Sequence, residues 1–160
     1  MAKFKVSYFA RIRKFAPNEI PVSTAQWDPK WFHPAHNPKG VYLDKRNVIN
    51  GLRVDPFVPN GHSGCCPGPR ECLWEPDKCN ATMFLREQYS KLNYGEIMSR
   101  FANLELRLRE KFPHLAEYPE LTFVFIVYEK PDNECSERHT IRWWFENMGF
   151  ALPEWEEPKE

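Results

Sequence analysis

The sequence predicts a single α/β domain with a mostly parallel central sheet, helices on its faces and a Pro/Cys-rich loop insertion. Residues 121–128 are apolar at almost every position, which is typical of a central strand covered on both faces. Apolar residues recur at helical spacing over 97–108. The order strand, strand, insertion, helices, strand, helix is that of strands joined by helical crossovers.

The size of the chain sets the domain organisation. It has 160 residues, of which 42% are hydrophobic, and this suits one domain with one core. We expect a single unit over 1–155, with a loop insertion at 26–80 and a disordered tail at 156–160. The insertion is expected because most of the fifteen prolines precede residue 80.

Two short strands are expected first, over 4–10 and 20–24, where β-branched and aromatic residues gather. Pro21 suits an edge or a strand entrance. Residues 26–60 are rich in Trp, Pro, Asn and His and show no sustained period. They predict a long ordered loop with at most one short hairpin.

Two helices should follow the insertion. The first is expected over 82–92, and the second begins after Asn93, whose spacing to Glu96 is that of an N-cap and capping-box pair. The second helix runs to about Lys111, because Pro113 disfavours its continuation.

The last elements follow the central strand. A helix is expected over 136–148, with Gly149 as its stop signal. Residues 150–155 are a candidate final edge strand.

Charge and hydropathy limit the partners. The formal net charge is zero, whereas proteins that bind duplex nucleic acid are usually basic. No apolar run reaches the roughly 18 residues of a transmembrane helix, and the N-terminus lacks the pattern of a signal peptide. We therefore expect a cytoplasmic protein with no membrane partner, in which disulfides are disfavoured.

Ligands of open α/β sheets bind beyond the carboxyl ends of the strands. The free N–H groups and the dipole of a helix that begins there attract anions. Applied to this chain, the rule gathers a set of candidate residues: Ser7, Arg11, Glu129, Lys130, Cys135, Arg138 and His139.

Three readings of this set remain open. Cys135 is a nucleophile, with its thiolate favoured at a helix N-terminus and Arg138 holding an anionic group. Alternatively, Arg138, His139 and Lys130 only bind a phosphate or carboxylate, and Cys135 is a small buried spacer. In the third reading, Glu129 and Arg138 form a structural ion pair.

The insertion carries a cysteine cluster with His62 just ahead of it. Four thiols at short spacing in a reducing compartment fit a tetrahedral zinc site, or less often an iron–sulfur cluster. Thiols without metal are the alternative, because adjacent cysteines do not easily chelate one ion. The candidate ligands are Cys65, Cys66, Cys72 and Cys79.

Aromatic residues open the insertion. Trp27, Trp31 and Phe32 can form a stacking platform for a base, or they can pack back on the core.

Two motifs resemble the bacterial and phage proteins grouped as domain of unknown function 488. S-Y-F-A-R-I-R-K, with I-P-V-S and P-K-W-F after it, resembles the opening of that family. V-Y-E-K-P-D-N-E-C-S-E-R-H-T-I-R-W-W resembles its closing signature, an apolar strand, E-K-P, a turn, C-H-R-H and a helix. The resemblance implies an α/β fold and this site location, and no established activity.

The chain departs from the family pattern in two places. C-S-E-R-H stands for C-H-R-H, so the histidine after Cys135 is missing and Arg138 is one residue further on. This weakens a cysteine–histidine pairing. The cysteine-rich segment 62–79 is not a feature of the family as a whole.

The leading hypothesis is that the protein binds an anionic ligand, such as a nucleotide or nucleic-acid phosphate. Processing of that ligand is an extension of the same hypothesis. Arg138 and Lys130 would hold the anion, Glu129 would orient Arg138 or act as base, and Arg11 would be a second clamp. The alternative is a non-enzymatic phage or bacterial accessory protein that uses a metal-stapled loop as its contact surface. A third reading is a purely structural domain. Whether the protein is an enzyme is left open.

Overall fold

The computed structural model describes residues 2–35, 50–60, 79–129, 131 and 136–158. Its centre is a four-stranded parallel sheet in the order β1-β4-β2-β3. The strands are β1 (Lys3–Tyr8), β2 (Glu19–Ser23), β3 (Leu52–Arg53) and β4 (Thr122–Val127). The predicted α/β class with a parallel sheet is confirmed, while most of the Pro/Cys-rich insertion lies outside the described residues.

The sheet is built around β4, which pairs with β1 on one side and β2 on the other. All of its residues are buried, as the apolar run predicted. Because side chains alternate along a strand, Phe123 and Phe125 belong to one core cluster, while Val124 and Ile126 belong to another.

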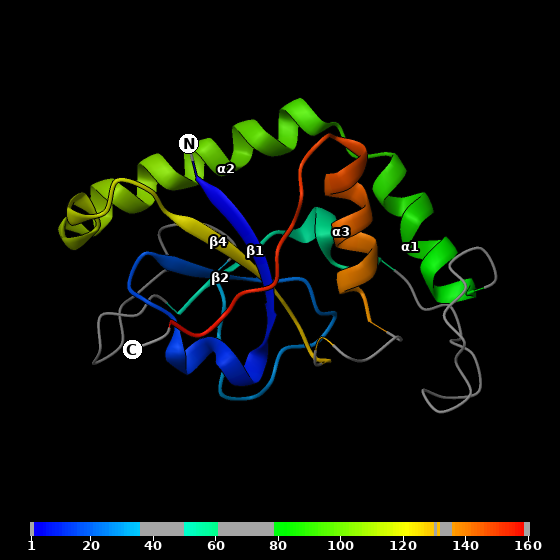
Figure 1. The fold of residues 1–160 in the computed structure, drawn as a ribbon, viewed down its shortest axis with the longest axis horizontal. Helices are drawn as coiled ribbons and strands as arrows, with labels where there is room; N and C mark the ends of the chain where they lie inside the picture. The colour runs from blue at the N-terminus through cyan, green and yellow to red at the C-terminus, as the bar shows by residue number, and fades with distance from the viewer. Residues whose placement is uncertain (1, 36–49, 61–78, 130, 132–135, 159–160) are drawn as a thin grey trace.

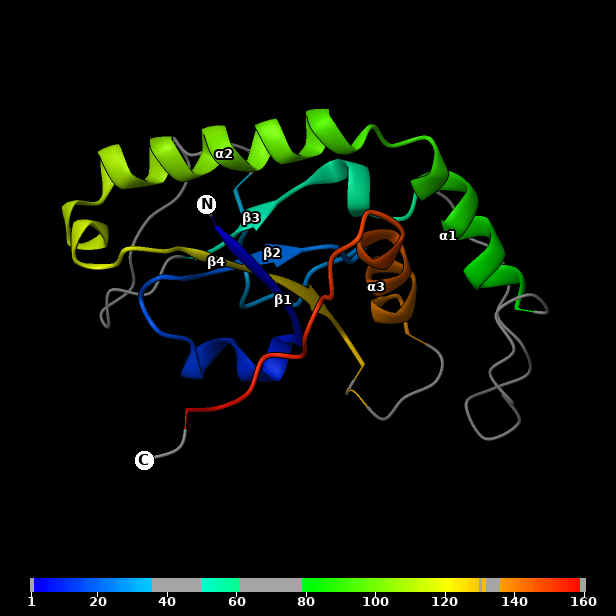
Figure 2. The same ribbon diagram turned by 45° about the horizontal axis from the view of Figure 1, so that its top comes forward.

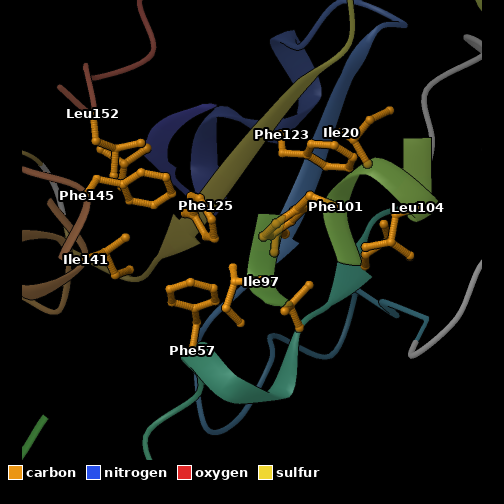
Figure 3. Close-up of a cluster of buried hydrophobic side chains, with 14 of the residues drawn as sticks. Ile20, Phe57, Ile97, Phe101, Leu104, Phe123, Phe125, Ile141, Phe145 and Leu152 are labelled. Atoms are coloured by element: carbon orange, nitrogen blue, oxygen red, sulfur yellow. The ribbon is translucent and has the colours of Figure 1, made fainter. Parts of the chain in front are cut away.

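Three α-helices contribute to the first cluster: α1 (Asn80–Ser90), α2 (Tyr94–Lys111) and α3 (Arg138–Asn147). Of these, α2 and α3 lie over one face of the sheet, and α1 packs against α3 on its outer side (Figures 1 and 2). In this core the Phe125 ring lies between two others, with centroid distances of 5.2 Å to Phe57 and 5.5 Å to Phe145 (Figure 3). The aromatic core fixes the face on which α3 and its N-terminus lie.

The second face of the sheet is covered by a 3-10 helix, η1 (Phe9–Lys14). The first strand was expected to continue to residue 10, but it ends at Tyr8. The chain turns there because Phe9 and Ile12 are buried in the second core cluster, with Val124 and Ile126 of β4.

The caps of α2 agree with the sequence pattern. The Asn93 side chain accepts the Glu96 N–H at 3.0 Å, and the helix ends at Lys111 before the 3-10 helix η5 (Pro113–Glu117). The first helix begins earlier than expected, at Asn80, because the Cys79 side chain caps it by accepting the Thr82 N–H.

The segment 26–60 does not contain the hairpin allowed for it within its described part. It contributes β3 instead, which pairs in parallel with β2 and is followed by the 3-10 helix η3 (Asp55–Phe57). Two parallel strands need a long crossover between them rather than a tight turn. The length of this segment therefore allows β3 to lie parallel to β2.

The chain returns to the sheet after α3. Gly149, at φ +87°, ends the helix, and the following segment approaches the outer edge of β1 (Figure 1). There the Val6 N–H donates to the Pro153 carbonyl at 3.0 Å, and the Trp155 N–H donates to the Val6 carbonyl at 2.8 Å. The expected edge strand is thus a single bridge at Glu154.

The tail forms an exposed contact: Glu157 pairs with Lys14 at 3.1 Å and with Arg11 at 3.8 Å. Across the parts of the chain that the structure describes, none of the helices has the length and apolar character needed to cross a membrane.

Candidate functional site

Arg138, the first residue of α3, is completely buried. Its Nε and Nη2 atoms donate to the two carboxylate oxygens of Glu154, at 2.6 and 3.4 Å. Its Nη1 atom donates to the Glu129 backbone carbonyl at 2.6 Å and to Ser136 Oγ at 3.5 Å. The guanidinium is therefore engaged inside the protein from several sides.

These contacts give Arg138 a positioning role. Glu154 also accepts from Arg142 Nη2 at 2.9 Å, so one carboxylate ties two successive turns of α3 to the edge of β1. The Glu129 carbonyl adds the end of β4. The structural ion pair proposed from the sequence joined Arg138 to the Glu129 side chain, whereas the close carboxylate is that of Glu154.

Two carboxyl groups lie near this N-terminus. The pKa of Glu137 is raised to about 8, chiefly by burial and in part by the charge of Glu129, against the opposing effect of Arg53. The pKa of Glu129 is also raised, chiefly by burial, against the opposing effects of a backbone hydrogen bond and of Arg138. Like charges in a poorly solvated place disfavour ionisation of both groups.

The Glu137 side chain also has a buried oxygen atom, Oε2, without a hydrogen-bond partner among the described residues. Glu137 is the N-cap residue of α3, yet its side chain makes no capping bond. Buried polar atoms are rarely left unpaired in folded proteins, so this oxygen is suited to meet a ligand or water.

A second ion pair borders the two glutamates. Arg53, at the end of β3, donates to Asp28 at 2.8 Å and to the Gln26 carbonyl at 3.0 Å. Asp28 in turn accepts from Ser23 Oγ, at the end of β2. The electrostatic effect of Arg53 on Glu137 links this pair to the N-terminus of α3.

Tyr89 of α1 also interacts electrostatically with Glu137. Its hydroxyl donates to the Phe57 carbonyl at 2.7 Å. Burial raises the pKa of Tyr89 well above its usual value, and the charge of Glu137 adds to this effect. The hydroxyl is therefore a neutral donor already used within the fold.

Exposed aromatic side chains lie at the same end of the sheet as these carboxylates. Trp27 is 76% exposed, Trp31 48% and Tyr128 50%, and we call these three the aromatic surface. The Tyr128 hydroxyl donates to the Trp27 carbonyl at 2.5 Å, and Arg13 lies 5.7 Å from the centroid of the Trp31 ring. Tyr128 directly precedes Glu129, and burial together with the charge of Asp28 raises the pKa of the Tyr128 hydroxyl, so the aromatic surface lies at the same end of the sheet as the carboxyl pair.

Phe32 behaves differently from its neighbours. It is buried in the second core cluster and packs against Phe9 at a centroid distance of 5.4 Å. Of the three expected platform residues, it is the one that packs back on the core.

The remaining candidate residues are dispersed. Ser7 is buried within β1. Arg11 lies on η1, donates to the Tyr8 hydroxyl at 2.8 Å and faces Glu157. His139 is half-buried in the first turn of α3. Lys130 and Cys135 lie outside the described residues.

The expected metal ligands Cys65, Cys66 and Cys72 lie outside the described residues, as does His62. Cys79 is described, and its Sγ accepts the Thr82 N–H at 3.5 Å as the N-cap of α1. Within the ranges that the structure covers, no three His, Cys, Asp or Glu side chains are grouped to hold an ion.

Sequence reasoning missed Glu137, Arg53 and Asp28. Glu137 falls inside the C-S-E-R-H motif, which is one residue longer than the C-H-R-H of the family. This extra length was the available signal in the sequence. Arg53 and Asp28 are brought together by β2 and β3, whose pairing was not expected.

Comparison with known proteins returns no matching family model, no matching curated protein and no matching solved structure. The resemblance to the domain of unknown function 488 family therefore stays an expectation based on the two motifs.

Proposed function

We propose that the carboxyl ends of β4 and β2 bind an anionic ligand, a nucleotide or a nucleic-acid phosphate, and that Glu137 meets it in its neutral form. One observation carries the proposal: the buried Oε2 atom of Glu137 lacks a hydrogen-bond partner among the described residues. With its pKa raised to about 8, this carboxyl group is mostly protonated at neutral pH.

Protonation decides whether an anion is accepted. An ionised carboxylate only accepts hydrogen bonds and repels a phosphate, whereas a carboxylic acid has an O–H group to donate. The N-terminus of α3 adds the positive end of a helix dipole at the same place. A neutral Glu137 at that helix start is therefore compatible with a phosphate, despite the neighbouring Glu129.

The roles of the other residues differ from those first expected. Arg138 holds α3 and the end of β4 in place through Glu154 and the Glu129 carbonyl. Lys130 remains a candidate cation for the ligand and His139 a candidate ligand-binding residue, whereas Arg138 is bonded to Glu154 and to the Glu129 carbonyl.

The paired carboxyl groups also suit acid–base chemistry. A protonated Glu137 can give a proton to a leaving oxygen, and Glu129 can accept one from an attacking group. The raised pKa of each brings it closer to neutral pH, where such transfers are most effective. Processing of the ligand is thus part of the same proposal, with Cys135 as the candidate nucleophile.

The aromatic surface favours a nucleotide over a simple phosphate. Trp27 and Trp31 offer exposed rings, with Trp27 bonded through its carbonyl to Tyr128 at the end of β4, and bases stack on such rings whatever their sequence. The zero net charge of the chain agrees better with a small or single-stranded ligand than with a duplex.

The test is a binding titration in which calorimetry measures the affinity for inorganic phosphate, nucleoside mono- and triphosphates and a short oligothymidine. Glu137→Gln keeps an N–H donor at every pH, whereas Glu137→Ala has none. Wild-type affinity should fall about tenfold between pH 7 and pH 9, as the neutral fraction of Glu137 falls, and the affinity of Glu137→Gln should not.

Glu110→Gln, on the exposed side of α2, is the matched control and should follow wild type. The proposal fails if none of these ligands binds, or if Glu137→Ala binds as tightly as wild type at pH 7 while remaining folded.

A further inference from the structure

A separate hollow of about 330 Å³ lies at the amino end of β1. In a parallel sheet this end is opposite to the one near which Glu129 and Glu137 lie. The volume falls within the roughly 300–1,000 Å³ of small-molecule pockets. The lining is almost entirely apolar and comes from β1, the start of α2, the end of α3 and the segment that follows it.

Aromatic rings form the walls of the hollow. Phe4 and Phe145 lie 5.4 Å apart between ring centroids, and Tyr94 stacks on Phe150 at 5.9 Å with an angle of 21° between the rings. Met98, whose unbranched side chain adapts to different shapes, lines the same space. Because aromatic rings pack favourably against one another, these walls suit a flat ring system.

The side chains that form these walls are uncharged. Side chains alternate between the two faces of a strand, and Phe4 packs on the core cluster to which α2 and α3 contribute. The side chains of Lys3 and Lys5 therefore lie on the opposite face, although both residues border the hollow. An ionic ligand would lose its hydration in the hollow without gaining a counter-ion. The walls thus favour an uncharged ligand.

The backbone of β1 supplies the polar groups. The Lys3 N–H donates inward, to the Leu121 carbonyl next to β4. The Val6 N–H donates outward, to the Pro153 carbonyl. The backbone groups of successive residues alternate between the two sides of a strand, so the N–H and C=O of Phe4 point outward, as those of Val6 do. That side of the strand borders the hollow.

Pro153 explains why these two groups are not used by the C-terminal segment. The segment joins the edge of β1 through a parallel bridge between Val6 and Glu154 (Figures 1 and 2). One step closer to the amino end of the same ladder, the Phe4 carbonyl would accept from residue 153, but a proline has no N–H to donate. Neither the N–H nor the C=O of Phe4 has a partner among the described residues.

We propose that this hollow binds an uncharged planar lactam, a ring system with an N–H and a C=O side by side on one edge. The ring packs between Tyr94, Phe145 and Phe150. The edge exchanges two hydrogen bonds with the Phe4 backbone, as two directly opposed residues of an antiparallel pair do. A few backbone donors and acceptors within apolar walls are typical of small-molecule sites. The hollow is independent of the proposed anion site, because it uses different residues at the other end of the strands.

The probes are 2-quinolone, an uncharged lactam, its N-methyl derivative, which has no N–H to donate, and 2-naphthoate, an anion of similar size. Calorimetry and amide chemical-shift mapping on the full chain measure affinity and location. 2-Quinolone should shift the amide signals of Phe4, Met98 and Phe150, with the Phe4 N–H signal moving downfield as it gains a hydrogen bond. It should bind about tenfold more tightly than either other probe, the effect of roughly one hydrogen bond.

Three variants test the location of the ligand. Ala151→Trp places a large ring into the hollow from an exposed position and should abolish binding of 2-quinolone. Ala102→Trp, at an exposed position of α2 away from the hollow, is the matched control and should bind 2-quinolone as wild type does. Lys5→Gln should also bind it as wild type does, because the Lys5 side chain lies on the other face of β1.

Equal binding of 2-quinolone and its N-methyl derivative would overturn the proposal, as would tighter binding of 2-naphthoate, unchanged binding by a folded Ala151→Trp variant or no binding of 2-quinolone. Glu137→Gln should bind 2-quinolone as wild type does. If wild type binds 2-quinolone and none of the nucleotides, the anion site is wrong and this hollow stands. The reverse result counts against this hollow alone.

Discussion

Arg138 and Glu154 form a two-point ion pair that joins the start of α3 to the chain segment at the edge of β1. Both carboxylate oxygens take part, at 2.6 and 3.4 Å from the guanidinium. The arginine is fully buried, while the Glu154 side chain is 25% exposed. Paired geometry of this kind is specific to arginine, because the planar fork matches a carboxylate.

Removing the arginine should be strongly destabilising. Arg138→Ala leaves Glu154 short of its main partner and the Glu129 carbonyl unpaired, and the loss of a buried partner costs about 3–5 kcal/mol in unfolding free energy. Arg138→Lys should recover only part of this, since a lysine cannot bond both oxygens and the carbonyl in the same geometry. Urea unfolding followed by circular dichroism measures both effects.

The exposed pair Lys14–Glu157, at 3.1 Å and about half exposed on each side, serves as the control. Lys14→Ala should change the unfolding free energy by less than about 1 kcal/mol. If Arg138→Ala were as mild as Lys14→Ala, the positioning role of Arg138 would be wrong.

Glu137 should make stability depend on pH. Its pKa is raised from an ordinary 4.5 to about 8, so between these values the folded protein binds more protons than the unfolded chain. The unfolding free energy therefore falls as pH rises across this window and levels off above it. At about 1.4 kcal/mol per pKa unit, the full effect is at most about 5 kcal/mol.

Glu137→Gln should remove this dependence. Its melting temperature should match that of wild type near pH 4.5 and exceed it increasingly toward pH 8, measured by calorimetry at constant ionic strength. A residual decline is expected from Glu129, whose pKa is raised in the same direction. Parallel curves for wild type and variant would show that Glu137 titrates normally.

The sequence predicts the sheet better than the site. Residues 121–128 could be recognised as a central strand because burial on both faces leaves an uninterrupted apolar run. The Asn93 cap could be recognised because capping is local. Such features depend on neighbours a few residues away.

The site depends on distant contacts that no local pattern contains. Arg138 was interpreted as a ligand clamp because a helix N-terminus beyond the end of a strand attracts anions. Its burial follows from the path of the C-terminal segment, which brings Glu154 back to it. Glu137 looks like a solvated residue in the sequence, and only its burial in the fold, together with the nearby charge of Glu129, gives it an unusual pKa.

The aromatic surface should contribute to ligand binding without contributing to stability. Trp27→Ala and Trp31→Ala should each weaken oligothymidine binding by about 1–3 kcal/mol if a base stacks there. Trp27→Ala should change the unfolding free energy by less than about 0.5 kcal/mol, because Trp27 is exposed. Quenching of tryptophan fluorescence during titration measures the affinity.

Leu106→Ala, which removes an exposed apolar side chain from α2, is the control and should bind as wild type does. Equal affinity of all three variants for oligothymidine would remove the aromatic surface from the proposed ligand site.

Cys79 offers a way to test the expected zinc site from within the described residues. As an N-cap, its sulfur accepts the Thr82 N–H, and serine performs this task at least as well as cysteine. If capping were its whole role, Cys79→Ser would keep wild-type stability and Cys79→Ala would lose about 1 kcal/mol. A metal-ligating Cys79 gives a different result, because a serine hydroxyl is a poor zinc ligand.

We therefore expect both variants to lose zinc, measured by elemental analysis of protein purified without chelator, together with a lower melting temperature. Chelator should lower the melting temperature of wild type and leave that of the variants unchanged, since metal binding adds to folding free energy. Full stability of Cys79→Ser, with no metal in wild type, would assign Cys79 to the helix cap alone.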